Sequence, residues 1–133
     1  MSYDALRRGR HSRHHQVYCI TTVTRGRYPV FTDITAARLL VRELRRLHEQ
    51  DEVISLAWVV MPDHLHWLIQ LNERWLLSTV VKTVKARSAL SINRYLCLQG
   101  SLWQRAYYDR AARKDEDVRR IARYIVANPL RAG

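Results

Sequence analysis

The positions of hydrophobic and β-branched residues along the chain predict a series of strands. Residues 16–24 are rich in β-branched residues and predict a first strand, and residues 55–60 predict a second. Met61-Pro62-Asp63 then makes a tight reversal, and residues 64–71 predict a third strand that is antiparallel to the second. A short strand flanked by loops is expected within residues 102–112.

Three further segments carry apolar residues at helical spacing. Asp33 is the expected N-cap of the first helix. The second helix is expected over about residues 74–96, with Gly100 ending the element. A third runs from a cap at Asp115 to about residue 127, where Asn128-Pro129 stops it. The apolar stripes of the three helices are Ala37, Leu40, Val41, Leu44 and Leu47; Leu77, Val81, Val84, Ser88 and Ile92; and Val118, Ile121, Ala122 and Ile125.

The order of these elements, β-α-β-β-α-β-α with a central hairpin, predicts the fold class. It favours an α+β, ferredoxin-like (RRM-like) antiparallel sheet with two helices packed on one face. Alternation divides the third strand into an apolar face that can carry helices, Leu65, Trp67, Ile69 and Leu71, and a mixed face, His64, His66, Leu68 and Gln70. The length predicts one domain over residues 1–133.

The charge balance points to nucleic acid. The chain has 23 Lys+Arg against 12 Asp+Glu, a net charge of +11. The alternative is a protein that is merely basic, for example because it binds the ribosome. Residues 1–15 are expected to form a basic arm through Arg7, Arg8, Arg10 and Arg13, and His11, His14 and His15 fit that arm better than they fit a metal tract.

The cysteines and the apolar segments indicate a cellular setting. Cys19 and Cys97 are far apart and form no Cys-x-x-Cys pair, which argues against a disulfide framework or a zinc ribbon and favours a reducing cytoplasm. No apolar run approaches the roughly 18 residues that a membrane span needs, and the N-terminus lacks the apolar core of a signal peptide.

His64-Leu65-His66 is the strongest candidate for chemistry. On a strand, the two imidazoles point to one side and can share one metal ion. On the last helix, Tyr124 and Asn128 are neighbours at i and i+4, on a second stripe with Asp117 and Arg120. If this helix lies across the histidine side of the sheet, the Asn128 amide oxygen would complete a three-ligand site, with the Tyr124 phenol beside it. Such a site suits phosphodiester chemistry.

These motifs resemble a known family. Residues 61–66 resemble the His-hydrophobic-His strand of the HUH single-tyrosine DNA nucleases, and residues 124–129 resemble the tyrosine helix of one branch, the REP-associated tyrosine transposases. Residues 6–10, residues 18–24 and Leu102-Trp103-Gln104 also fit that branch. The resemblance covers nearly the whole chain.

The resemblance implies a metal-dependent endonuclease and strand transferase that cuts single-stranded DNA beside palindromic REP hairpins. It implies that Tyr124 is the nucleophile, that His64 and His66 are metal ligands, and that Asn128 is the third ligand. It also implies a covalent 5′-phosphotyrosine, Mg²⁺ or Mn²⁺ as the metal, and a bacterial, nucleoid-associated location. A monomer is expected, although a swapped dimer remains open.

Several interpretations stay open. Tyr107 and Tyr108 are rival nucleophiles, which we interpret as packing or base-stacking groups. Alternation is expected to point Asp63 away from the histidine face. Trp103 is expected in the core, and the arginines of the first helix on a solvated surface. Candidate DNA contacts are Lys82, Lys85, Gln104 and Arg105, of which the two lysines fit a solvated helix face equally well.

Two other functions remain alternatives at this point. A non-catalytic RRM-like module that binds single-stranded nucleic acid would need exposed aromatic residues on its central strands. A replication initiator or relaxase of the same superfamily would use the same chemistry for a different purpose.

Overall fold

The structure, a computed structural model, describes residues 16–72, 74–112, 119–120 and 122–123. Its centre is an antiparallel sheet of four strands in the order β2-β3-β1-β4. The strands are β1 (Val17–Val23), β2 (Val53–Met61), β3 (His64–Leu71) and β4 (Tyr108–Ala112). This strand order, with β1 and β3 in the middle, confirms the ferredoxin-like α+β fold that the sequence predicts.

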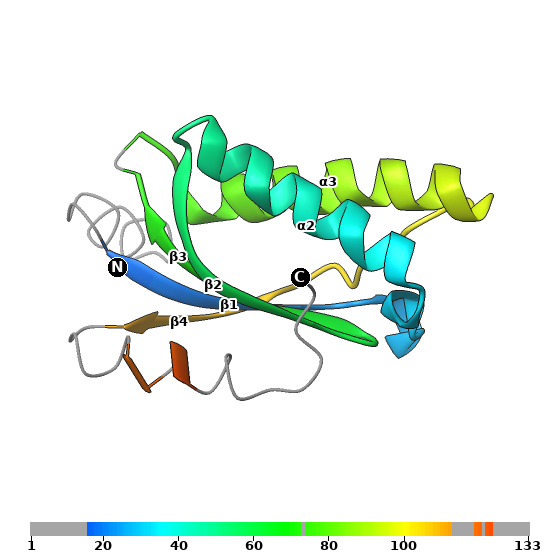
Figure 1. Cartoon of the computed structure of the whole chain (residues 1–133), viewed down its shortest axis with the longest axis horizontal. Coiled ribbons are helices and arrows are strands. Elements are labelled where there is room, and N and C mark those ends of the chain that lie inside the picture. Colours follow the sequence, from blue (N-terminus) through cyan, green and yellow to red (C-terminus); the bar gives the residue numbers. More distant parts are fainter. Residues whose placement is uncertain (1–15, 73, 113–118, 121, 124–133) are drawn as a thin grey trace.

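Two α-helices cover one face of this sheet (Figure 1). They are α2 (Ile34–Glu49) and α3 (Leu77–Leu96), and two short 3₁₀ helices, η1 (Arg25–Arg27) and η2 (Val30–Thr32), lie between β1 and α2. The Asp33 carboxylate accepts hydrogen bonds from the backbone N–H groups of Thr35 and Ala36, at 2.9 and 3.1 Å. Asp33 is therefore the N-cap that the sequence predicts.

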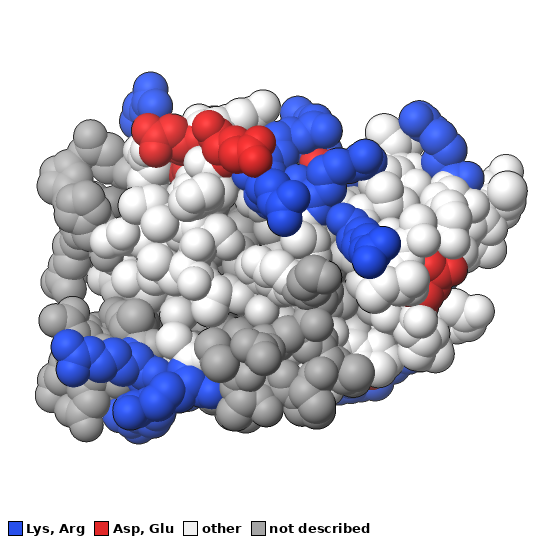
Figure 2. Space-filling model, viewed as in Figure 1, with Lys and Arg blue, Asp and Glu red and all other residues white. Residues whose placement is uncertain are grey.

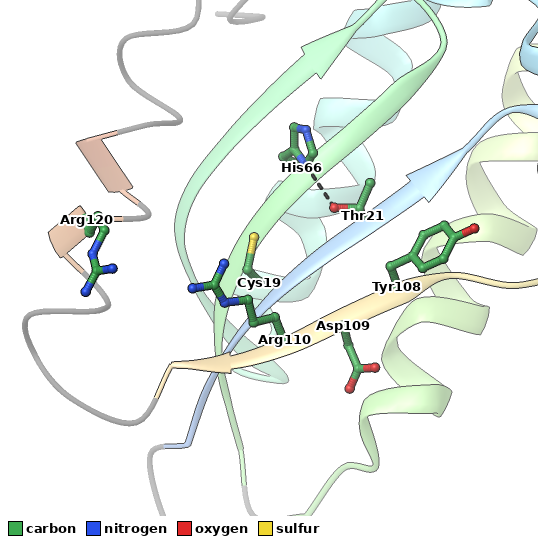
Figure 3. A pocket seen from close by; sticks show the side chains of 7 residues that line it. All are labelled: Cys19, Thr21, His66, Tyr108, Asp109, Arg110 and Arg120. Atoms are coloured by element: carbon green, nitrogen blue, oxygen red, sulfur yellow. Dashed lines mark hydrogen bonds between the residues drawn. The ribbon is translucent and has the colours of Figure 1, made fainter.

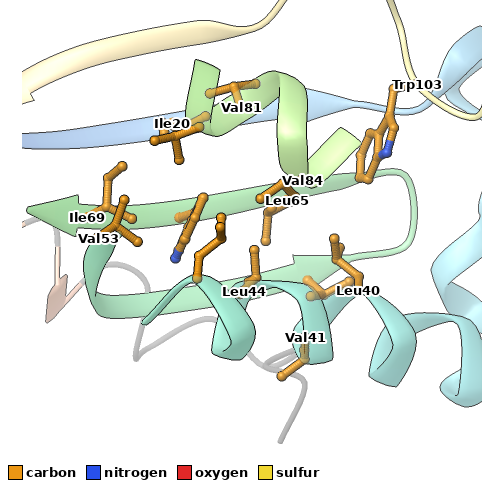
Figure 4. Packing of buried hydrophobic residues seen from close by; sticks show 14 of the residues in the cluster. Ile20, Leu40, Val41, Leu44, Val53, Leu65, Ile69, Val81, Val84 and Trp103 are labelled. Carbon is orange, nitrogen blue, oxygen red and sulfur yellow. The ribbon is translucent and has the colours of Figure 1, made fainter. Parts of the chain in front are cut away.

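The hydrophobic core lies between the sheet and the two helices (Figure 4). Leu65, Trp67, Ile69 and Leu71 are all buried there, which confirms the predicted apolar face of β3. Trp67 also satisfies its indole N–H, since Nε1 donates to Ser55 Oγ at 2.8 Å. The predicted stripes of α2 and α3 are buried in the same core, so one face of β3 is fixed against the helices and the other must face away from them.

The second helix begins later than predicted and ends at the predicted residue. It begins at Leu77 instead of residue 74, because Asn72 Oδ1 accepts from the Arg74 backbone N–H in a turn before it. It ends at Leu96, as predicted, although Cys97 rather than Gly100 terminates it. Cys97 takes the left-handed conformation there, with φ of 56°, and its N–H bonds to Asn93 O.

The last predicted helix reaches the opposite face of the sheet. Arg119, Arg120, Ala122 and Arg123 are helical. Ala122 packs against a small buried cluster of Val17, Val59 and Leu68, which lies on the sheet face opposite α2 and α3. These described residues thus lie on the face of the sheet where the sequence analysis expects the helix. Tyr124, Asn128 and the arm of residues 1–15 fall outside the described residues.

No helix in the described ranges is long and apolar enough to cross a membrane.

Candidate active site on the histidine face

The sheet face opposite α2 and α3, which we call the histidine face, brings His64 and His66 together. Their ring centroids are 4.8 Å apart, and the ring planes stand at 82° to each other. Both side chains leave β3 on the same side, as their spacing predicts. Cross-strand pairing places Val23 of β1 opposite His64 and Thr21 opposite His66. The face therefore holds two imidazoles close enough to be candidate ligands of one metal ion.

Thr21 orients the ring of His66. Its Oγ1 lies 2.9 Å from His66 Nδ1 across the β1–β3 pair. Burial, and secondly the neighbouring His64, lower the pKa of His66 below its usual value of 6.5. The ring is thus neutral at neutral pH, which is the form that binds metals, and with Nδ1 bonded to Thr21 a metal would have to use Nε2.

Asp63 orients the ring of His64. His64 Nδ1 donates to Asp63 Oδ1 at 2.6 Å, and the other carboxylate oxygen accepts from Arg27 Nη1 at 3.0 Å. The hydrogen bond from His64, helped by the one from Arg27, holds the pKa of Asp63 below its usual value of 3.8. A carboxylate at Nδ1 places the ring proton there and leaves Nε2 as the basic nitrogen.

The expected orientation of Asp63 was wrong. Alternation would point its side chain away from the histidine face, but Asp63 lies in the turn between β2 and β3, where strand alternation does not apply. Thr24 holds this turn, since its backbone N–H and its hydroxyl both donate to Asp63 O, at 2.9 and 3.1 Å. Residues 25–27 then bring Arg27 to the carboxylate through left-handed backbone at Gly26 and Arg27, with φ of 63° and 54°.

The described residues supply two candidate metal ligands, His64 and His66, and no complete site. Among them, no group of three or more His, Cys, Asp and Glu side chains could hold a metal ion. A pair of oriented imidazoles fits a divalent metal only if further ligands join it, because a site with two protein ligands is weak. Asn128, the predicted third ligand, and Tyr124, the predicted nucleophile, lie outside the described residues.

A cavity of about 520 Å³ opens on the histidine face beside His66 (Figure 3). Thr21 and Cys19 of β1 lie on one side of it, and β4 supplies Tyr108 and Arg110. Arg120, from the last helical residues, also lines the cavity. Arg120, which precedes Tyr124 in the predicted helix, therefore lines the same cavity as His66.

Lys85, which the sequence analysis names as a candidate DNA contact, binds backbone carbonyls of the segment that follows α3. Its Nζ donates to the carbonyl oxygens of Gln104 and Ala106, at 2.7 and 2.9 Å. It also lies 5.8 Å from the centre of the Tyr107 ring. Burial lowers the pKa of Lys85. The lysine thus fastens residues 104–107 to α3, a role that the local sequence pattern does not indicate.

The other predicted DNA contacts lie along α3 and the segment that follows it. Lys82 and Arg105 are exposed, and Gln104 is half-buried. With Lys85 they line a groove of about 430 Å³. Their contact with DNA stays a prediction, as does that of Arg7, Arg8, Arg10 and Arg13, which lie outside the described residues.

Two predictions about non-catalytic residues are confirmed. Trp103 is buried in the core, and its Nε1 donates to Ser88 Oγ at 2.9 Å. Basic side chains gather over the helical layer (Figure 2), where Arg38, Arg42 and Arg45 of α2 are exposed. These arginines form a solvated outer face, on the side of the molecule away from the histidines.

Sequence reasoning missed the partners of the two histidines. Thr21 and Arg27 are distant from residues 64–66 in the sequence and reach them through strand pairing and a loop. Arg110 was also missed, because its place beside the cavity depends on the pairing of β4 with β1, which puts it opposite Cys19. The alternation of β1 could have suggested Thr21, but only if its register with β3 were known.

Comparison with known proteins decides the family. Residues 12–128 match the family described as "Transposase IS200 like". The chain belongs to the IS200-like transposase family. It is thus an enzyme of the transposase and nuclease class, and the family match spans both the histidine pair and Tyr124. No curated protein matches the chain.

Solved structures share the fold of this IS200-like transposase. One, described as "Structure of the REP associates tyrosine transposase bound to a REP hairpin", is 23% identical with a TM-score of 0.69, over 88% of this chain and 70% of the other. A putative transposase from Deinococcus radiodurans R1 is 24% identical with a TM-score of 0.64, over 86% of this chain and 91% of the other. Both confirm the predicted architecture.

Proposed function

We propose that this transposase cuts and rejoins single-stranded DNA beside hairpins, with a divalent metal bound by His64 and His66 and with Tyr124 as the nucleophile. The observation that carries the proposal is the histidine pair. Each Nδ1 has an oxygen partner, Asp63 or Thr21, so both Nε2 atoms are set as ligands on one side of the sheet. Asn128 would add an amide oxygen as the third ligand.

The position of Arg120 supports the proposed placement of Tyr124. In a continuous helix, residue 124 lies one turn beyond residue 120 on the same side. Arg120 lines the cavity that contains His66, and Ala122 packs on the sheet. These two contacts support a helix whose next turn presents Tyr124 to the histidine pair. Asn128 would follow after one further turn.

The reaction conserves the number of phosphodiester bonds. The phenolate oxygen of Tyr124 attacks phosphorus, the bond from phosphorus to the 3′ oxygen breaks, and that oxygen leaves and takes up a proton. The 5′ phosphate stays on Tyr124 as an ester, so a 3′ hydroxyl can reverse the step and join a strand. When bound, the metal would polarise the scissile phosphate and lower the barrier to attack.

The identity of the metal ion and the kind of DNA are more specific parts of the same proposal. Two imidazoles suit Mn²⁺ better than Mg²⁺, which prefers oxygen ligands, so both ions belong in the assay. Single-stranded DNA with a hairpin is the proposed partner. The net charge of +11 and the fold shared with a protein described as bound to a REP hairpin support it. We propose that the protein acts as a monomer.

The alternative of a non-catalytic binding module loses support from the sheet. Its central strands would have to present aromatic side chains for base stacking. On the histidine face, β1 and β3 instead carry Thr21, His64, His66 and Gln70 together with small or aliphatic side chains. The family match to a transposase likewise argues against a replication initiator or relaxase.

Formation of a covalent adduct tests the proposal. The protein is incubated with an end-labelled single-stranded oligonucleotide carrying a hairpin, in Mn²⁺ or Mg²⁺, and run on a denaturing gel. The wild type is expected to give a protein-DNA band, Tyr124→Phe none, and His64→Ala a greatly reduced one. DNA binding by Tyr124→Phe should persist. A band that survives in Tyr124→Phe and is lost in Tyr108→Phe would assign the nucleophile to Tyr108 and refute the proposal.

A further inference from the structure

We propose that the cavity beside His66 is a nucleobase site, in which a base close to the cleaved phosphate stacks on the ring of Tyr108. This inference rests on the proposed function, since it presumes single-stranded DNA on the histidine face. It gives Tyr108 a binding role separate from the nucleophile.

The sheet places Tyr108 in line with the histidines. Tyr108 begins β4 and pairs with Thr21 of β1, which in turn pairs with His66 of β3. The three residues form one row across three strands, on the same face, and all three line the cavity (Figure 3). Because neighbouring strands lie about 4.8 Å apart, the backbone of Tyr108 lies about 10 Å from the backbone of His66, two strands away. That span corresponds to one or two nucleotides of an extended strand.

The exposure of Tyr108 suits a stacking platform. Its relative exposure is 66%, although it lies at the edge of a cavity on a folded sheet. Tyr95, another exposed tyrosine, is held on the helical side by hydrogen bonds from its hydroxyl to the Asp33 carboxylate. An aromatic ring that stands open beside a cavity offers its face to any base, whatever the sequence.

The remaining lining fits a nucleotide. Arg110 and Arg120 line the cavity and can contact phosphates next to a stacked base, and Asp109 adds one carboxylate to the lining. Cys19 lies opposite Arg110 on β1, and burial raises the pKa of its thiol, so that part of the wall is uncharged at neutral pH. The volume of about 520 Å³ lies within the usual range of small-molecule pockets, roughly 300–1,000 Å³.

A cycle of protein and DNA changes tests the stacking directly. Binding is measured by fluorescence anisotropy for a hairpin oligonucleotide and for versions with a single abasic site moved along its single-stranded flank. Tyr108→Ala should weaken binding of the intact DNA by about 5-fold to 150-fold, the range for loss of one stacked base. One abasic position should weaken wild-type binding to a similar extent. At that position Tyr108→Ala should have no further effect, because the stacking partner is already gone.

Matched variants separate stacking from other roles. Tyr108→Phe keeps the ring and should restore the affinity that Tyr108→Ala loses. Tyr95→Ala removes an exposed tyrosine on the helical side and should bind as the wild type does. The inference would be overturned if Tyr108→Ala binds the intact DNA as tightly as the wild type does. It would also be overturned if the affinity losses from Tyr108→Ala and from the abasic site add at every position.

Adduct formation in the same samples keeps the two proposals distinct. If the wild type forms the adduct but the affinity losses from Tyr108→Ala and from each abasic site simply add, the base site is overturned while the proposed function stands. Coupling at one abasic position without any wild-type adduct would support the base site and refute the proposed chemistry. If Tyr108→Phe binds normally and forms no adduct, the hydroxyl of Tyr108 takes part in the reaction, and the division of roles between Tyr108 and Tyr124 is refuted.

Discussion

Replacing Asp63 with asparagine should weaken metal binding by the histidine face without disturbing the fold. The carboxylate accepts from His64 Nδ1 at 2.6 Å and so fixes both the tautomer and the direction of the ring. An amide of nearly the same shape can present either its oxygen or its NH₂ group to that nitrogen, so the preference for a basic Nε2 is lost. The backbone contacts of the turn, from Thr24 to Asp63 O, do not involve the carboxylate and should persist.

The expected size of the effect follows from the exposure of the groups. Changes to the partners of metal-binding histidines typically cost 10-fold to 100-fold in metal affinity. The side chains of His64 and Asp63 are 21% and 23% exposed, so solvent screens their interaction and the lower end, about 10-fold, is expected. The side chain of Arg27 is 64% exposed. Arg27→Gln should therefore cost less, about 5-fold at most.

Titration of the metal-free protein with Mn²⁺, followed by electron paramagnetic resonance, measures this affinity without DNA. Arg25→Gln is the matched control, because it removes an equal charge from the same loop. The expected order of affinities is wild type and Arg25→Gln, then Arg27→Gln, then Asp63→Asn. Equal Mn²⁺ affinity of Asp63→Asn and the wild type, with both proteins folded, would show that His64 needs no carboxylate and would refute this reasoning.

Three further predictions concern Lys85, Leu68 and His66. Lys85→Met should lower the free energy of unfolding by about 2 kcal/mol, because the carbonyls of residues 104 and 106 lose a charged donor. The control Lys82→Met should change it little, and urea denaturation would measure both variants. Leu68→Ala should cost about 2–4 kcal/mol in the same assay, because Leu68 is fully buried beneath Ala122. The lowered pKa of His66 should appear as an NMR titration midpoint below 6.5 in the metal-free protein, and the corresponding stability should be complete above pH 6.5 and lost as the pH falls through that midpoint. A midpoint at or above 6.5, a harmless Leu68→Ala or equal effects of the two lysine variants would each contradict its prediction.

The local sequence pattern was sufficient to predict the elements that carry the site. Alternation along β3 separates the histidines from the buried Leu65, Trp67 and Ile69, and this holds because the helices bury only one face of the sheet. The N-cap at Asp33 and the stripe of α3 depend only on neighbouring residues. Each of these features is decided within a few residues of the chain, which is why the sequence predicts it.

The contacts that tune the site depend on long-range geometry. Thr21 and His66 are 45 residues apart, and Arg27 and Asp63 are 36 apart. Strand order and register bring them together, and neither can be read from local spacing. Tyr108 illustrates the same limit. Its sequence context allows two interpretations, packing or base stacking, and only the pairing of β4 with β1 places the residue beside the cavity that His66 lines.

Identification of the tyrosine that carries DNA tests the central claim most directly. After incubation with the hairpin oligonucleotide and Mn²⁺, the protein is digested with nuclease and trypsin and its peptides are analysed by mass spectrometry. Cleavage after arginine separates the tyrosines, since residues 124–131, 106–110 and 95–105 fall in different peptides. The account predicts a phosphonucleotide on Tyr124 in the peptide of residues 124–131. The same mass on residues 106–110, with residues 124–131 unmodified, would contradict it.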